Sequence, residues 1–147
     1  MNGIVPQRKL ELSDILMTGV VDEFYYLPAE NKYNQLIKQS VNSDDPYQLY
    51  QLRKYIVRVP ESGVCPTLTA NMGLGGHNVP FVFHNARLRK LTEYECLGLQ
   101  GFPASFKFPD NVNKSKRYVL VGNAVSPAVS AVIADRVKSF LHSEVCS

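Results

Sequence analysis

A glycine-rich stretch, Asn71 to Asn78, carries the side chains of this chain that are best suited to contacting a ligand. Gly75 and Gly76 let the backbone bend sharply and come close to a bound group. Asn71, His77 and Asn78 add hydrogen-bonding groups that suit base edges or the backbone of a nucleic acid. A nucleotide site is disfavoured, because no lysine follows in Walker fashion and the spacing is not GxGxxG. A tight surface loop without a ligand remains the alternative.

The three cysteines do not suggest a metal site or a disulfide framework. Cys65, Cys96 and Cys146 are odd in number and show no CxxC spacing. We expect reduced thiols and no metal.

The seven basic residues between positions 84 and 118 face only three acidic ones, so this block holds most of the formal net charge of +3. Such an excess predicts either a patch that faces phosphate groups or an ordinary solvated surface. Its members are Arg87, Arg89, Lys90, Lys107, Lys114, Lys116 and Arg117.

The composition is that of a folded domain, with 45% hydrophobic and 20% charged residues over 147 positions. No run approaches the roughly 18 apolar residues of a membrane helix, and the first residues lack a signal-peptide core. We expect a cytoplasmic protein with no membrane association.

Two helices are expected in the N-terminal third, one starting near Leu12 and ending at Gly19, the other over residues 28–38 with Pro28 in its first turn. Residues 55–59 alternate as a strand, which places Arg58 on the face opposite Tyr55. Arg58 is then either a surface residue or a reader of guanine, whose edge fits the arginine fork.

The middle of the chain predicts further β-structure. Pro66 confines residues 64–70 to an edge strand or a strand end. Residues 79–84 and 87–91 read as a hairpin, although its turn lacks glycine. This hairpin would place Arg87 and Arg89 next to the helix that follows it.

A capped helix begins after Thr92. Thr92 and Glu95 have the spacing of a capping box, and Leu91 and Cys96 are placed for a hydrophobic staple. Gly101, followed by Pro103, ends the helix.

The C-terminal part reads as a short strand, a turn and a long helix. The strand spans Tyr118 to Val121 and stops at Gly122-Asn123, and Ser126 caps a helix with Pro127 at its first position. Its apolar residues recur at helical spacing as Val129, Val132, Ile133, Val137, Phe140 and Leu141. We expect the apolar face formed by these residues to close a core. When the surface that it packs against is absent, we expect this face to be exposed.

Three ordered segments resemble the C5-cytosine DNA methyltransferases, bacterial restriction-modification enzymes among them. The pattern LTxxExxxLQGFP at residues 91–103 and GNAV at 122–125 look like their last two motifs. CPTLTANMGLGGHNVP, residues 65–80, looks like their target-recognition region.

The resemblance implies roles for matching residues. Gly122, Asn123 and Ala124 would line part of an S-adenosyl-L-methionine pocket shared with a partner chain. Thr67, Leu68, Gly75 and Gly76 match loops that approach the DNA, and with Arg58, Asn71, His77, Asn78 and Arg87 they form the expected DNA-binding set. A structural role falls to Arg89, Thr92, Glu95, Gln100, Gly101, Phe102 and Pro103.

The chain also departs from the family. It contains no Pro-Cys-Gln stretch, so none of its cysteines matches the catalytic nucleophile. Tyr94 and Gly98 stand where arginine is frequent, which argues against phosphate contacts from that helix.

We therefore expect an α+β fold, with a target-recognition region at residues 1–91 and the last two motifs and terminal helix at residues 92–147. The long helix would dock on a missing Rossmann-like catalytic domain. The chain would be the DNA-recognition subunit of a split, heterodimeric bacterial methyltransferase, inactive alone, with double-stranded DNA and a large catalytic subunit as partners. A non-catalytic DNA-binding remnant and an unrelated interaction domain are the alternatives.

Overall fold

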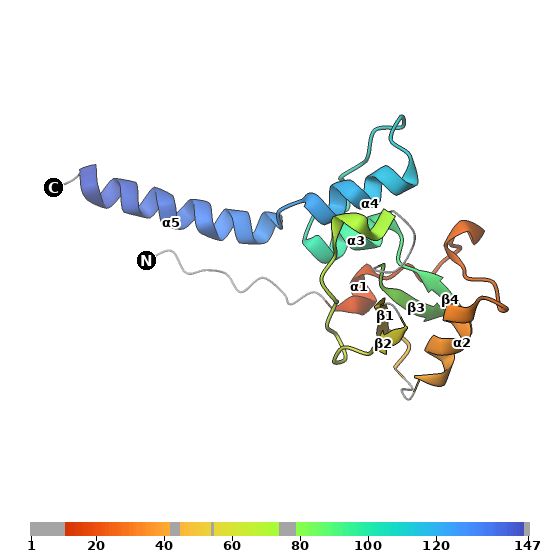
Figure 1. The fold of residues 1–147 in the computed structure, drawn as a ribbon. Helices are drawn as coiled ribbons and strands as arrows, with labels where there is room; N and C mark the ends of the chain where they lie inside the picture. The colour runs from red at the N-terminus through yellow and green to blue at the C-terminus, as the bar shows by residue number, and fades with distance from the viewer. Residues whose placement is uncertain (1–10, 42–44, 54, 74–78, 146–147) are drawn as a thin grey trace.

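The computed structural model describes residues 11–41, 45–53, 55–73 and 79–145. Helices and a small antiparallel sheet are mixed along the chain, which confirms the α+β expectation (Figure 1). The elements are α1 (Leu12–Ile15), the 3-10 helix η1 (Glu23–Tyr25), α2 (Lys32–Gln39), β1 (Leu49–Arg53), β2 (Ile56–Arg58), the 3-10 helix η2 (Ala70–Gly73), β3 (Phe81–His84), β4 (Arg87–Lys90), α3 (Glu93–Gln100), α4 (Lys114–Asn123) and α5 (Pro127–Val145).

The described strands form one sheet in the order β2-β1-β3-β4, and each neighbouring pair is antiparallel. The expected hairpin is confirmed as β3 and β4. Its turn residues Asn85 and Ala86 both adopt left-handed backbone conformations, with φ of 50° and 60°. Two-residue hairpin turns need such angles to match the twist of the strands, so the turn forms although neither residue is glycine.

Hydrophobic clusters cover both faces of the sheet. Tyr50, Leu52, Phe81 and Leu88 pack with Ile37 of α2 in one cluster. The strand residues that alternate with them belong to the other face, where Leu49 and Val82 join a cluster that includes residues of α1, α3 and α4. This second cluster takes residues from both sides of the domain boundary expected after residue 91, and that boundary stays a prediction.

The capped helix α3 forms as the sequence predicts. The N–H of Glu95 donates to Thr92 Oγ1 at 3.1 Å, and the Thr92 N–H donates to Glu95 Oε2 at 2.7 Å. Leu91 and Cys96, the expected staple, are fully buried in the same cluster. Gly101 ends the helix with a φ of 88°, a conformation that favours glycine.

Residues 118–121, expected as a strand, lie inside α4, so that prediction was wrong. Asn113 caps this helix, since its side chain accepts from the Lys116 N–H at 2.8 Å. Tyr118 and Val121, three residues apart, then share the face that is buried in the core. A four-residue apolar run does not distinguish strand from helix by periodicity, and here the cap and the core contacts decide.

Three other boundaries differ from the expected ones. Asn31 caps α2 by accepting from the Tyr33 N–H at 2.9 Å, so α2 starts at Lys32 and not at Pro28. α1 ends at Ile15, well before Gly19. Residues 64–69 form neither strand nor helix and lead into η2, while β1 was not predicted at all.

The terminal helix α5 extends away from the rest of the chain (Figure 1). It starts at Pro127 as predicted, and the Ser130 N–H donates to the Ser126 carbonyl at 3.0 Å. Each of the six apolar residues from Val129 to Leu141 that the sequence places on one face is between 53% and 63% exposed. The helix therefore closes no core within the described chain, contrary to one expectation, and its apolar face is open, in keeping with the other.

The segment Lys114–Ser143 contains an 18-residue window with a mean hydropathy of 1.4, enough by length and composition for a membrane-crossing helix, and 11% of that window is buried. The segment is not one continuous helix, because α4 ends at Asn123 and α5 begins at Pro127. The expectation of no membrane association stays a prediction.

A buried ion pair joins the sheet to α3. Arg89 Nη1 and Nη2 donate to Glu95 Oε2 and Oε1 at 2.8 and 2.7 Å, a bidentate pair in which both side chains are 1% exposed. The backbone of Met17, just after α1, donates to Glu95 Oε1 at 2.7 Å and accepts from Arg89 Nη2 at 3.3 Å. One carboxylate thus holds strand β4, the start of α3 and the segment after α1.

We expect Glu95→Gln to lower the free energy of unfolding by about 3–5 kcal/mol, because it leaves the buried Arg89 without a counter-charge. Glu23→Gln is the matched control. Glu23 pairs with Arg87 in solvent, where such pairs contribute little. Urea unfolding followed by circular dichroism measures both variants, and equal midpoints would show that the buried pair does not hold the fold together.

Candidate functional site

The first part of the predicted recognition segment lies directly against α4. A Cβ at Gly122 would be 2.3 Å from the backbone N of Ala70 and 2.3 Å from the backbone C of Thr69. Real atoms do not pack that closely, so only glycine permits this approach. Met72 of η2 is buried in the same cluster as Val121 of α4. The contact fixes η2 against the end of α4.

The turn expected to follow a strand at residues 122–125 instead connects two helices. Gly122 and Asn123 are the last residues of α4, and Ala124 is its C-cap, with φ of −72° and ψ of 149°. Gly122 and Ala124 are half-buried, whereas Asn123 is exposed. Packing therefore accounts for the glycine, and of the two exposed residues of this turn, Asn123 and Val125, Asn123 is the polar one.

Arg58 and Thr67, two of the expected DNA contacts, line one cavity of about 410 Å³. Gln51 and Arg53 of β1 line the same cavity, and sequence reasoning missed both of them. The signal was the alternation over Tyr50, Gln51, Leu52 and Arg53, which sends apolar and polar side chains to opposite faces of a strand.

Other members of the expected DNA-binding set lie elsewhere. Leu68 is half-buried against the core cluster. Asn71 is exposed, and its side-chain oxygen accepts from the Thr69 hydroxyl. Gly75, Gly76, His77 and Asn78 fall outside the described residues.

Arg87 sits at the turn end of the β3–β4 hairpin and is already engaged. Both of its terminal nitrogens donate to the Glu23 carboxylate, and its guanidinium lies 4.2 Å from the centre of the Tyr26 ring. The pairing raises the pKa of Arg87 and lowers the pKa of Glu23. Arg87 does not line the cavity that holds Arg58 and Thr67.

The basic block between residues 84 and 118 is largely engaged within the chain, and whether it faces phosphate groups stays a prediction. Besides Arg87, three of its members are ion-paired, as Arg89–Glu95, Lys114–Asp22 and Arg117–Glu93. Lys90 is half-buried, and burial lowers its pKa. Most of this positive charge is therefore neutralised by carboxylates of the same chain.

Two of the residues expected to be structural, Gln100 and Phe102, make contacts around the end of α3. Gln100 Nε2 donates to the Val121 carbonyl at 3.3 Å, which ties the end of α3 to α4. The Phe102 N–H donates to the Leu97 carbonyl at 3.0 Å, and its ring packs edge-on against Phe106. Together with the left-handed C-cap Gly101, these contacts shape the end of α3.

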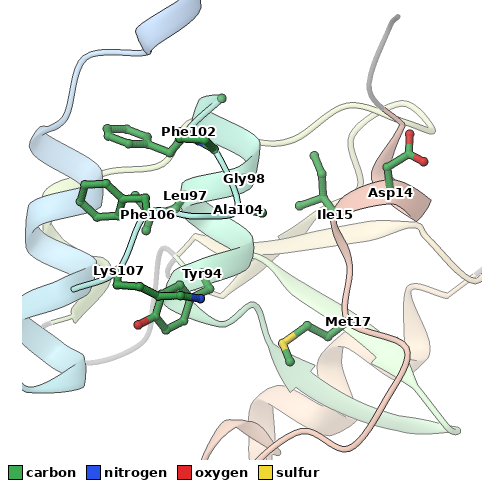
Figure 2. Close-up of a pocket in the computed structure, with 12 residues that line it drawn as sticks. Asp14, Ile15, Met17, Tyr94, Leu97, Gly98, Phe102, Ala104, Phe106 and Lys107 are labelled. Carbon is green, nitrogen blue, oxygen red and sulfur yellow. The ribbon is translucent and has the colours of Figure 1, made fainter. Parts of the chain in front are cut away.

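An apolar cavity of about 670 Å³ lies between α1, α3 and residues 102–107 (Figure 2). Tyr94 and Gly98, where the family often has arginine, both line it. A Cβ at Gly98 would already be 3.0 Å from Ile15 Cγ2. This face of α3 thus packs towards α1.

The described cysteines lack nucleophile character. Burial raises the pKa of the Cys65 thiol to about 12, and burial likewise raises the pKa of Cys96. A reactive cysteine needs a lowered pKa and access to solvent. Within the described residues, no group of three His, Cys, Asp or Glu side chains is arranged to hold a metal ion.

Comparison with known proteins agrees with the motifs. Residues 7–139 match the C-5 cytosine-specific DNA methylase family. The chain belongs to this family. It is 41% identical over 121 residues to the Type II methyltransferase M.Bsp6I of Bacillus sp. (strain RFL6), which covers 82% of this chain and 38% of that methylase.

Two further methylases show the same relationship over shorter stretches. M.HgiCI of Herpetosiphon aurantiacus is 49% identical over 59 residues, 40% of this chain and 14% of its own length. DNA (cytosine-5)-methyltransferase 3 of Arabidopsis thaliana is 36% identical over 88 residues, 58% of this chain and 6% of its own length. The chain therefore spans well under half of each of these methylases.

The fold is also methylase-like. It resembles the structure of the Entamoeba histolytica methyltransferase EhMeth with a TM-score of 0.52 and 24% identity, over 92% of this chain and 42% of that chain.

We expect Gly122→Ala to lower the free energy of unfolding by about 1–3 kcal/mol or more, because the added methyl group must displace the backbone of η2. Gly19→Ala is the matched control, since a Cβ there meets nothing within 4 Å. Thermal unfolding distinguishes the two variants. A Gly122→Ala melting temperature equal to that of Gly19→Ala would mean that α4 does not pack this closely on η2.

Proposed function

We propose that this chain is the target-recognition part of a DNA (cytosine-5)-methyltransferase. It selects a specific site in duplex DNA and completes the S-adenosyl-L-methionine pocket of a catalytic part that carries the nucleophile. That catalytic part is the large subunit of a bacterial restriction-modification enzyme, acting on cytoplasmic DNA. Methyl transfer to C5 of a flipped-out cytosine takes place there, while the present chain holds the duplex.

The exposed helix α5 is the observation that carries this proposal. A soluble helix buries an apolar stripe against a core or a partner, and large exposed apolar patches mark interaction sites. Ile133 and Phe140 lie on the stripe of α5 and are 57% and 59% exposed. Family membership supplies the partner, because the matched methylases extend well beyond the region that this chain covers.

The residues at the end of α4 fit a partial role in cofactor binding. Asn123 offers an exposed amide, which supplies hydrogen-bond donors and an acceptor. Residues 121–126 include no charged side chain. This turn therefore adds one or two hydrogen bonds to S-adenosyl-L-methionine, and the groups that hold its charged amino acid portion come from the catalytic part. Docking of α5 brings Asn123 to that part.

A chimera tests both statements. The chain should replace the matching 38% of the Bacillus sp. methyltransferase and restore methyl transfer, whereas the isolated chain should transfer no methyl group. In the chimera, Asn123→Ala should weaken S-adenosyl-L-methionine binding by about 1–3 kcal/mol and leave DNA affinity unchanged.

Isothermal titration with the cofactor and fluorescence anisotropy with labelled duplex measure the two affinities separately. Turnover by the isolated chain would refute the division of labour. If Asn123→Ala lowered DNA affinity as much as cofactor affinity, the turn at residues 122–125 would have a structural role only.

Docking through α5 has its own test. Ile133→Asp should abolish association with a catalytic part expressed as a separate chain. It should leave the melting temperature of the isolated chain unchanged, because Ile133 is 57% exposed and belongs to no core cluster of the described residues. Ala131→Asp is the matched control. Residues two apart lie about 200° around a helix, so Ala131 is on the far side of α5. Analytical ultracentrifugation reports association, and loss of association in both variants would contradict a specific apolar face.

A further inference from the structure

The cavity between β1, β2 and residues 59–67 presents hydrogen-bond donors that have no partner in the described chain. In the β1–β2 register, Gln51 pairs directly with Arg58, and Arg53 pairs with Ile56. Directly opposed residues share a face, as do residues two apart on one strand. Gln51, Arg53 and Arg58 therefore point to the same side, and diagonal neighbours such as the two arginines lie about 7–8 Å apart.

The positive charge of this cavity is not neutralised within the described part of the chain. Arg87, Arg89, Lys114 and Arg117 each pair with a carboxylate. Neither Arg53 nor Arg58 forms an ion pair among the described residues, and the residues lining the cavity include no Asp or Glu. The Cys65 thiol at its wall is neutral, because burial raises its pKa to about 12.

Gln51 shows that the cavity lacks a partner group. Its side chain is buried, the residue being 2% exposed, and Nε2 has no acceptor in the described structure. A buried donor without an acceptor costs free energy. Gln51 is one of the residues that line the cavity, beside two arginines that form no ion pair within the described chain. An anion that offers several acceptors would suit all three side chains.

We propose that this cavity binds a backbone phosphate of duplex DNA, held by Arg53 and Arg58 at its rim and by Gln51 Nε2 at its floor. The proposal rests on the proposed function, which supplies the DNA. A phosphate group projects from the duplex and carries only acceptors, so it can enter a recess to reach a buried donor. The edge of a stacked base pair cannot follow it there.

Such a contact anchors the chain without reading sequence. Phosphate contacts set the register and orientation of a protein on the duplex, while base contacts specify the site. The cavity is connected to the predicted recognition segment through Thr67, which lines its wall. The phosphate contact thus positions the residues that follow Thr67 over the groove.

The full chain should be titrated with several labelled duplexes of different sequence at several salt concentrations. Arg53→Gln and Arg58→Gln should each weaken binding to every duplex about tenfold, and should each lower the slope of log affinity against log salt by about 0.9. Lys38→Gln is the control, because it removes one exposed positive charge from α2, on the other face of the sheet.

Gln51→Leu adds a readout that a purely structural role would not give. It removes the unsatisfied donor, so the free chain should melt at an equal or higher temperature, yet bind all duplexes more weakly. Melting temperatures of the arginine variants should equal that of the wild type, since both side chains are exposed.

Three results would overturn the proposal. A loss confined to one duplex sequence, with an unchanged salt slope, would make the arginines base readers. Affinities equal to that of Lys38→Gln would remove the cavity from the interface and leave the proposed function standing. A wild-type chain that binds no duplex, either alone or within the chimera, would remove the DNA-recognition role together with the phosphate site.

Discussion

The described fold depends on the buried pair between Arg89 and Glu95. Removing two charges from water costs several kcal/mol each, and this cost is offset only when geometry and additional hydrogen bonds are good. Here the pair is bidentate, and Glu95 also accepts from the backbone N–H groups of Met17 and Thr92. The same carboxylate therefore completes the helix cap, joins β4 to α3 and holds the segment after α1. Loss of either partner would leave a bare charge where three elements meet.

Local signals predicted the parts of this arrangement that are local. The capping box at Thr92, the left-handed stop at Gly101 and the hairpin before them depend on residues a few positions apart. The role of Arg89 does not depend on nearby residues alone. The resemblance to the methylases assigned it a structural role, but its charge also placed it in a surface patch, because alternation along β4 puts it opposite Leu88 and nothing in the local sequence shows that both faces of the sheet are covered.

The misassigned elements have the same origin. Tyr118 and Val121 lie on one face of a helix, which packs against residues of α3 and η2 in the core. The run of four apolar residues is too short to show whether it has helical or strand periodicity. Because β1 was not predicted, half of the candidate DNA site was not predicted either. Gln51 and Arg53 lie beside Arg58 only because β1 pairs with β2. Strand pairing brings together residues that are not adjacent in the sequence. Which residues pair depends on the strand register, and a single sequence does not reveal that register.

The close contact at Gly122 places η2 next to the short connection between α4 and α5. Only residues 124–126 separate α4, which is packed on η2, from α5. Ala124 is extended, and Ser126 precedes Pro127, whose ring restricts the preceding residue to extended conformations and fixes its own φ. The connection therefore has little freedom. If a catalytic part binds the apolar face of α5, as proposed, this connection would also orient η2 and the described residues from Thr67 onward relative to that part.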